Sequence, residues 1–133
     1  MPIAPTLVIV PPGGLKGWDI QLLELALKTE MEQRTIQDIL NEHEDGTCQI
    51  WRFESPEGYG IGLTEKKGNE LFVHYVSGKG VLPYIEKIVD AMGAWGKGVG
   101  CVALTSRSNP GMVRVLQKRC GFRPLWTDMR KEL

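Results

Sequence analysis

The sequence predicts a single mixed α/β (α+β) domain in the order strand, two helices, three antiparallel strands, helix, strand, helix, strand. Three observations support this prediction. An apolar strand at 71–76 passes through a glycine turn into a helix whose apolar residues recur close to every 3.6 positions. A near-continuous apolar run at 100–105 is typical of a strand buried inside a sheet. Two segments, 47–54 and 59–66, are separated by turn residues and predict a hairpin.

The first expected elements are a short strand and two helices. The strand covers Thr6–Val10 and stops at a Pro-Pro-Gly-Gly run. A helix follows, and a second helical pattern spans about 34–42 and ends at Gly46. We interpret the acidic run 42–45 as a solvated helix end rather than a metal site. The apolar residues expected on the inner face of the first helix are Leu15, Trp18, Leu22 and either Leu25 or Ala26.

Three strands are expected next. Pro56 takes the second position of the turn between the first two. Gly60 and Gly62 leave one face of the second strand without side chains, so either a ligand or another stretch of backbone approaches there, or the strand twists. The segment from Leu71 to Thr105 then predicts a right-handed parallel crossover.

The turn Ser77–Gly80 stands where the central strand gives way to a helix, with Pro83 in its first turn. A glycine turn that leads into a helix N-terminus directs backbone N–H groups at one point, which suits an anion such as phosphate. The pattern fits neither the P-loop nor the dinucleotide fingerprint, and an ordinary strand-to-helix turn is the alternative.

The last expected elements are a helix and a strand. Asn109 can cap the helix, Pro110 begins it and Cys120-Gly121 ends it. Phe122 would open the final strand.

Composition and charge limit the functional classes. A chain of 133 residues forms one domain that buries roughly two-thirds of its unfolded surface. Three cysteines without metal-like spacing suggest a reducing cytoplasm, and no apolar run is long enough to span a membrane.

Residues 1–96 hold 8 basic and 14 acidic residues, whereas residues 97–133 hold 8 basic and 2 acidic residues. The basic C-terminal part would suit a polyanionic ligand, and the acidic part would suit a cationic one. The alternative is that the uneven charge distribution only reflects a solvated surface. Zero net charge without basic–aromatic interleaving argues against a nucleic-acid-binding protein.

The element order and two segments resemble the GNAT family of acyl-CoA N-acyltransferases. The family's turn, Arg/Gln-x-x-Gly-x-Gly/Ala, holds the pyrophosphate of coenzyme A. Gly80 matches its central glycine, whereas Ser77 replaces the Arg/Gln and Leu82 replaces the last Gly/Ala. The resemblance implies a GNAT-like mixed sheet, acetyl-CoA as cosubstrate, and contacts to it from Ser77, Gly78, Lys79, Gly80, Val81 and Leu82.

The second segment, 109–122, is similar to the family's asparagine-containing turn, helix and closing Gly-Phe. It implies Asn109 as a further coenzyme contact. The family's tyrosine, which often protonates the leaving thiolate, falls on Gln117, and glutamine cannot act as an acid. The chain also resembles small GNAT-like internal virion proteins of tailed bacteriophages. That likeness rests on Trp95, Gly98, Thr105, Arg107, Gly111-Met112, Arg114, Leu116 and Gly121-Phe122.

The resemblance also implies where catalysis would occur. The pantetheine arm would lie where the central strand parts from the next parallel strand, with Phe72 and His74 among its contacts. Candidate bases are Glu54 and His74, and Tyr75 is a substitute acid. A hairpin-end carboxylate, a hydrogen-bonded strand histidine and a packing tyrosine are the respective structural alternatives.

Two hypotheses follow. The first is an N-acetyltransferase that moves the acetyl group of acetyl-CoA to a primary amine. The second is a GNAT-fold structural or assembly protein without turnover, kept for interaction or inside a phage virion. Neither needs a resident metal, both fit the cytoplasm or a virion, and both are compatible with a homodimer or a virion partner.

Overall fold

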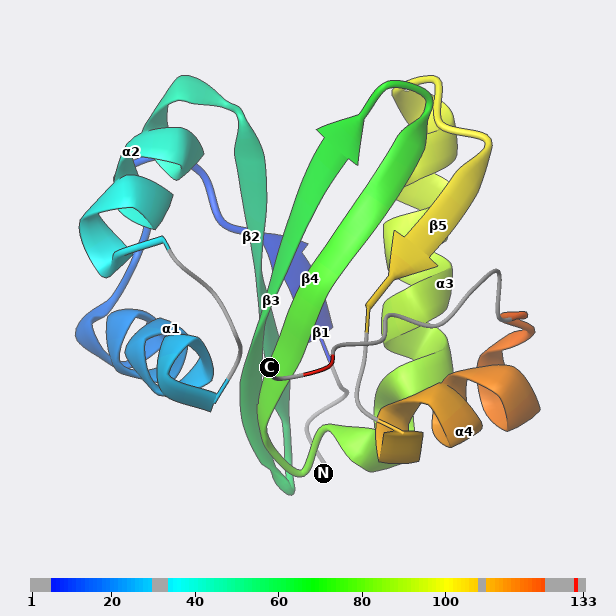
Figure 1. Ribbon diagram of the computed structural model, residues 1–133. Helices are drawn as coiled ribbons and strands as arrows, with labels where there is room; N and C mark the ends of the chain where they lie inside the picture. The colour runs from blue at the N-terminus through cyan, green and yellow to red at the C-terminus, as the bar shows by residue number, and fades with distance from the viewer. Residues whose placement is uncertain (1–5, 30–33, 108–109, 124–130, 132–133) are drawn as a thin grey trace.

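The computed structural model describes residues 6–29, 34–107, 110–123 and 131. Five strands form one sheet in the order β1-β2-β3-β4-β5 (Figure 1). Neighbouring strands are antiparallel except β4 and β5, which are parallel. The strands are β1 Thr6–Ile9, β2 Cys48–Ser55, β3 Gly58–Lys67, β4 Glu70–Lys79 and β5 Ala103–Ser106. The helices are α1 Gly17–Thr29, α2 Ile36–Asp45, α3 Ile85–Gly98, preceded by the 3₁₀ turn η1 Leu82–Tyr84, and α4 Pro110–Cys120.

The observed order confirms the predicted mixed α+β fold. Helices α1 and α2 lie on one side of the sheet, and α3 lies on the other (Figure 1). Each face carries its own apolar core, which includes Ile50 and Leu63 on the α1–α2 side and Trp51 and Leu71 on the α3 side. The expected last strand is not seen at Phe122, which has no regular structure, and the rest of it lies outside the described residues.

The ends of α2 confirm the local rules that predicted a helix there. Thr35 and Asp38 form a capping box, in which each side chain bonds the backbone N–H of the other residue. Gly46 closes the helix at φ 86°, in the left-handed region that favours glycine.

The central strand β4 is longer than the sequence predicted. The sequence predicts Ser77, Gly78 and Lys79 in the turn, but in the structure they pair with β3, where Lys79 lies opposite Tyr59. The β2–β3 hairpin extends to Ser55 and Gly58, so it offers backbone partners to residues that would otherwise turn away. The link between β4 and η1 is therefore reduced to Gly80 and Val81.

The bare face of β3 is filled by the protein itself. A Cβ atom on Gly60 would lie 2.6 Å from Val81 Cγ2 and 2.8 Å from the Ser77 carbonyl oxygen. A Cβ atom on Gly62 would lie 2.9 Å from Met92 Cε. Close approach of backbone, one of the alternatives above, thus accounts for Gly60, whereas the end of the Met92 side chain fills the space at Gly62.

A β-bulge in β4 changes which way its side chains face. Thr64 pairs with Val73, but the preceding residue Leu63 pairs with Tyr75, which leaves His74 as an extra residue in β4. Val73 accordingly belongs to the α3-side core, whereas Tyr75 belongs to the α1–α2 core. The bulge places His74 at the level where β4 stops pairing with β5.

Helix α1 uses a partly different face from the one predicted. Leu23 and Ala26 are buried, whereas Leu25 is exposed. The sequence pattern missed Leu23 because the polar residue Asp19, one turn before it, is also fully buried and breaks the apolar period.

Candidate active site

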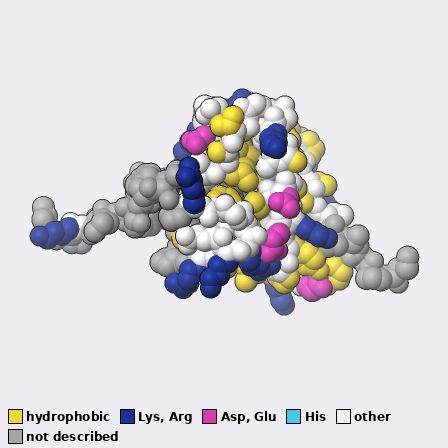
Figure 2. Space-filling model, turned by 90° about the vertical axis from the view of Figure 1, so that its right-hand side faces the viewer, with side chains coloured by type: hydrophobic (Ala, Val, Ile, Leu, Met, Phe, Trp, Pro, Cys, Tyr) yellow, Lys and Arg dark blue, Asp and Glu magenta, His cyan; other side chains and the backbone are white. Residues whose placement is uncertain are grey.

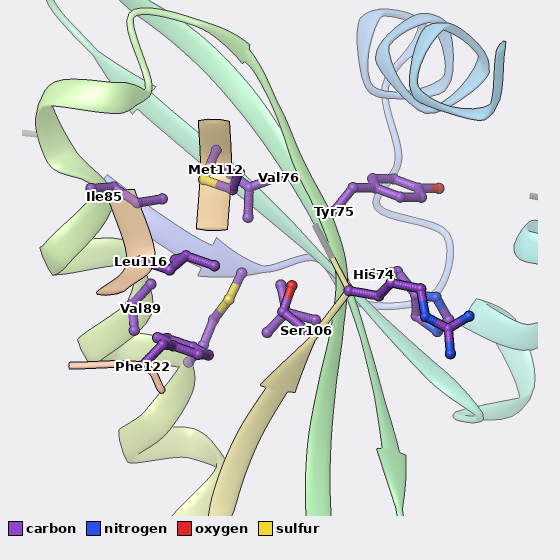
Figure 3. Close-up of a pocket in the computed structure, with 12 residues that line it drawn as sticks. His74, Tyr75, Val76, Ile85, Val89, Ser106, Met112, Leu116 and Phe122 are labelled. Carbon is purple, nitrogen blue, oxygen red and sulfur yellow. The ribbon is translucent and has the colours of Figure 1, made fainter. Parts of the chain in front are cut away.

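Strands β4 and β5 pair only over four residues and then separate. The pairs run from Glu70 with Ala103 to Val73 with Ser106. A cavity of about 80 Å³ lies beyond the last pair, between β4, the end of β5, α3 and α4 (Figure 3). We call this place the fork. Residues that line the cavity are Val73, His74, Tyr75, Val76, Ile85, Val89, Met92, Ser106, Arg107, Met112, Leu116 and Phe122.

The fork cavity is mostly apolar. Figure 3 shows Ile85, Val89, Met112 and Leu116 gathered on the helical side, with Ser106 beside them at the end of β5. On the strand side, β4 contributes the four consecutive residues Val73–Val76, which include the bulge. Among the described residues, β5 no longer pairs with β4 beyond Val73, so this stretch of backbone is a natural place for a ligand to form hydrogen bonds.

The His74 and Tyr75 side chains are directed away from the apolar group in the cavity (Figure 3). The Nε2 atom of His74 lies 2.9 Å from Glu65 Oε1 on β3. The His74 ring also makes an edge contact with Phe72, at 4.6 Å between ring centres. The fork therefore has an apolar cavity on the α3–α4 side and a polar cluster on the α1–α2 side.

Arg34, which precedes α2, joins the polar cluster. Its Nη2 atom lies 3.3 Å from His74 Nδ1, and its Nη1 atom lies 2.5 Å from Glu42 Oε2 and 3.8 Å from Glu65 Oε1. The sequence predictions missed Arg34, Glu42 and Glu65, because Arg34 and Glu42 belong to the α2 region whereas Glu65 lies on β3 and His74 on β4. No local motif connects them with His74.

The other two catalytic candidates lie in different surroundings. The Tyr75 ring is buried in the α1–α2 core. Glu54 is exposed and, through the register, lies level with Tyr59 and Lys79. It is thus five residues along the sheet from His74, or about 16 Å at 3.3 Å per residue. The structure groups His74 and Tyr75 at the fork and leaves Glu54 outside that group.

The glycines of the expected phosphate turn pack against the hairpin. Gly78 has φ 143°, and a Cβ atom there would lie 2.3 Å from the Tyr59 carbonyl oxygen. Gly80 has φ 73°, and a Cβ atom there would lie 2.9 Å from the Glu57 carbonyl oxygen. Both positions therefore require glycine even without a ligand.

The surroundings of this turn carry both signs of charge. Lys79 is exposed, and Leu82 is 48% exposed, while Val81 is buried. The carboxylate of Glu57 accepts a hydrogen bond of 2.6 Å from the Tyr84 hydroxyl, which lowers the pKa of Glu57. An anion at the turn would thus meet one lysine and one nearby carboxylate.

Helix α4 closes the fork with Met112 and Leu116. Gln117 is exposed and does not line the cavity, and Asn109 lies outside the described residues. Within the described residues, no three His, Cys, Asp or Glu side chains are grouped so that they could hold a metal ion. No helix in the described part of the chain is both long and apolar enough to cross a bilayer.

The architecture matches those of solved acetyltransferases. An aminoglycoside acetyltransferase from an uncultured soil metagenomic sample, in complex with sisomicin, superposes with a TM-score of 0.64 at 6% identity, over 97% of this chain and 96% of that one. The fold is that of the GNAT acetyltransferases. It is the fold class that the sequence predicted.

Two further solved structures have a similar fold. Glucosamine-6-phosphate N-acetyltransferase from Arabidopsis thaliana has a TM-score of 0.63 at 15% identity, over 98% of this chain and 99% of that one. A predicted acetyltransferase with acetyl-CoA from Clostridium acetobutylicum has a TM-score of 0.64 at 10% identity, over 96% of each chain. No protein-family model and no curated protein sequence matches the chain.

Proposed function

We propose that this protein is an N-acetyltransferase that moves the acetyl group of acetyl-CoA to a primary amine. The observation that supports this most is the fork, where an apolar cavity meets the His74 bulge in a fold shared with structures that hold acetyl-CoA or a coenzyme A analogue.

In this proposal the donor lies on the α3–α4 side of the fork. The pantetheine arm enters the apolar cavity and pairs with the β4 backbone between Phe72 and Tyr75. A backbone N–H of this stretch polarises the thioester carbonyl, because a fixed donor stabilises the oxyanion that develops there. The pyrophosphate lies against the Ser77–Leu82 segment, where exposed Lys79 supplies a positive charge.

The acceptor approaches from the polar side. His74 takes a proton from the acceptor ammonium, and the free amine attacks the carbonyl carbon. The new C–N bond forms as the C–S bond breaks, and the thiolate of coenzyme A leaves. Solvent protonates that thiolate, since Gln117 cannot and the Tyr75 ring lies in the α1–α2 core on the other side of the sheet. Glu54 would act as the base only for an acceptor long enough to reach it from the fork.

The test is calorimetric titration of acetyl-CoA into the purified protein. Ser106→Phe places a ring at the mouth of the fork, and Val8→Phe adds the same bulk on the exposed edge strand β1. Lys79→Glu reverses the charge beside the proposed pyrophosphate, with Lys87→Glu on exposed α3 as its control. We expect micromolar binding that only Ser106→Phe and Lys79→Glu weaken, by at least tenfold, or about 1.4 kcal/mol.

Folded protein that binds no acetyl-CoA at millimolar concentration would contradict the proposal. Binding that all four variants retain would place the donor elsewhere. Gly80→Glu is unsuitable as a probe, because its side chain would meet the Glu57 backbone and disturb the fold.

The second candidate is a GNAT-fold protein without turnover that serves in assembly, such as a phage virion component. Two observations favour it: the Glu57 carboxylate lies beside the expected phosphate turn, and exposed Gln117 takes the position of the usual acid. This alternative predicts no acetyl-CoA binding and a stable complex with a second protein. The cytoplasmic location and a homodimeric state belong to either proposal.

A further inference from the structure

Two partners of opposite hydrogen-bonding character hold the His74 ring. A carboxylate can only accept hydrogen bonds, and a guanidinium can only donate them. Glu65 Oε1 lies 2.9 Å from Nε2, so Nε2 carries the proton. Arg34 Nη2 lies 3.3 Å from Nδ1, so Nδ1 offers its lone pair. The same Arg34 nitrogen lies 3.5 Å from His74 Nε2. Because Nε2 donates its proton to Glu65, it cannot also accept a hydrogen bond from Arg34.

The sheet register explains why Glu65 meets this ring. Glu65 on β3 lies directly opposite Phe72 on β4. Because the bulge makes His74 an extra residue, its ring turns back against Phe72 and comes within reach of the Glu65 carboxylate. The side chains of His74 and Glu65 are only 13% and 23% exposed, so water screens their interaction weakly.

We propose that Glu65 is a positioning residue that holds His74 as the Nε2–H tautomer, so that Nδ1 is the atom that takes the proton from the acceptor ammonium. This inference rests on the proposed acetyl transfer. An ammonium, like the Arg34 guanidinium, can only donate hydrogen bonds. Arg34 therefore marks the place from which the acceptor cation reaches Nδ1, and it must move aside when the acceptor binds.

The proton balance of this step is closed. The ammonium gives its proton to Nδ1, which makes an imidazolium whose charge faces the Glu65 carboxylate. The attacking nitrogen gives up a second N–H proton as the C–S bond breaks, and the thiolate of coenzyme A takes up one proton. The imidazolium then releases its own proton to solvent, so the reaction frees one proton overall. Among the described residues, the charged groups around the ring include Glu65 on β3, Arg34 and Glu42 next to and within α2, and Arg107, which lines the fork with His74.

The first experiment needs no substrate. The chain has two histidines, His43 and His74, so their ring ¹⁵N signals can be assigned with His43→Gln and followed with pH. We expect the Nε2–H tautomer for His74. In Glu65→Ala the Nδ1–H form appears and the pKa of His74 falls, because the imidazolium has lost its carboxylate. Glu65→Gln, which keeps an acceptor oxygen, restores the tautomer but not the pKa.

Glu42→Ala is the matched control for charge. It removes a carboxylate of similar exposure from the same cluster, but Glu42 contacts Arg34 and not His74. We expect Glu42→Ala to leave the His74 tautomer unchanged. It should also change the pKa of His74 less than Glu65→Ala does. A His74 ring that keeps its tautomer and pKa in Glu65→Ala would overturn the inference, whether or not the protein is an enzyme.

The second experiment measures the pH profile of kcat/KM with an amine acceptor. Since a base must be unprotonated to act, activity rises with pH through the pKa of His74. Glu65→Gln should move this acid limb to lower pH and reduce kcat by less than the roughly 10²–10⁴-fold loss expected for His74→Ala. An unmoved limb in an active Glu65→Gln enzyme would contradict the positioning role. Absence of acetyl-CoA binding by the wild type would refute the proposed function and this role with it, even if the ring signals show the contact with Glu65.

Discussion

Single residues in this protein have their properties fixed by burial. Asp19 is fully buried, and Arg52 binds both of its carboxylate oxygens, at 3.1 Å and 2.5 Å. Arg52 also donates to the Gly14 carbonyl and lies over the Trp18 ring. Asp19 in turn accepts from the backbone N–H of Lys16. One ion pair thus ties the loop before α1 to the middle of β2.

Removing one partner of this pair should be costly. We expect Arg52→Ala to lower the free energy of unfolding by about 3–5 kcal/mol, because Asp19 would remain as a buried charge without its counterion. Arg119→Ala, which breaks the pair with Glu86 on the protein surface, is the matched control and should cause no measurable change. Urea unfolding followed by circular dichroism gives both values, and similar losses for the two variants would contradict this account.

Burial likewise controls Cys48. It raises the pKa of the Cys48 thiol from its ordinary value near 9.0 to about 12, with a further contribution from the Glu42 carboxylate. The folded state therefore keeps a proton that the unfolded chain loses, so this thiol contributes stability below pH 9 that is lost as the pH rises toward 12.

This predicts a pH-dependent difference between wild type and Cys48→Ala. The stability advantage of the wild type should shrink between pH 9 and about 12. At pH 8 a variant whose only cysteine is Cys48 should react with a thiol reagent only when unfolded. Rapid labelling of that folded variant, relative to one whose only cysteine is the less buried Cys120, would show that the thiol is accessible.

At the scale of elements, the close contact between β3 and β4 decides the position of the fork. Gly78 in β4 packs directly on Gly60 and Tyr59 in β3, and this contact extends the pairing to Lys79. In the described part of the chain, the pairing of β5 with β4 ends at Val73 and Ser106, and the two parallel strands part there. The fork exists because one neighbour of β4 follows it to its end and the other does not.

Gly78→Ala tests this contact. At φ 143° an alanine is strained, and its Cβ atom would collide with the Tyr59 carbonyl oxygen, so we expect a loss of at least about 2 kcal/mol in unfolding free energy. Gly98→Ala, in the last turn of α3 with open space around the new Cβ, should instead be neutral or stabilising by up to about 1 kcal/mol. Equal effects of the two substitutions in thermal unfolding would contradict the packing argument.

At the scale of the whole molecule, the sheet separates two faces with different chemistry. One face carries α1, α2 and the polar cluster, and the other carries α3 and the apolar cavity (Figure 1). Figure 2 shows the side of the molecule beyond β5, where apolar and charged side chains lie close together. A groove on that side is lined by Glu70, Asp90 and Lys97 together with apolar Val102, which is 76% exposed.

This arrangement predicts unequal protection of backbone amides. β3 is paired on both sides and buried from Gly60 to Thr64, whereas β5 pairs only with β4 among the described residues. We expect amides of β3 to exchange with D₂O only through global unfolding, and those of β5 to exchange through local opening. Hydrogen exchange followed by NMR measures both, and equal protection of β3 and β5 would contradict this prediction.

Periodicity and turn residues in the sequence alone determined the type and order of the described strands and α-helices, and with them the fold class. These signals are local, so one chain segment carries each of them. Only the tertiary structure determined which side chains form the polar cluster at His74, that most of the glycine turn pairs with β3, and that Asp19 is buried. Those depend on β-sheet register, and a single bulge at His74 reverses which side chains meet. No local pattern encodes that Glu65 faces His74, because the contact is created by pairing two strands and inserting one residue between their matched positions.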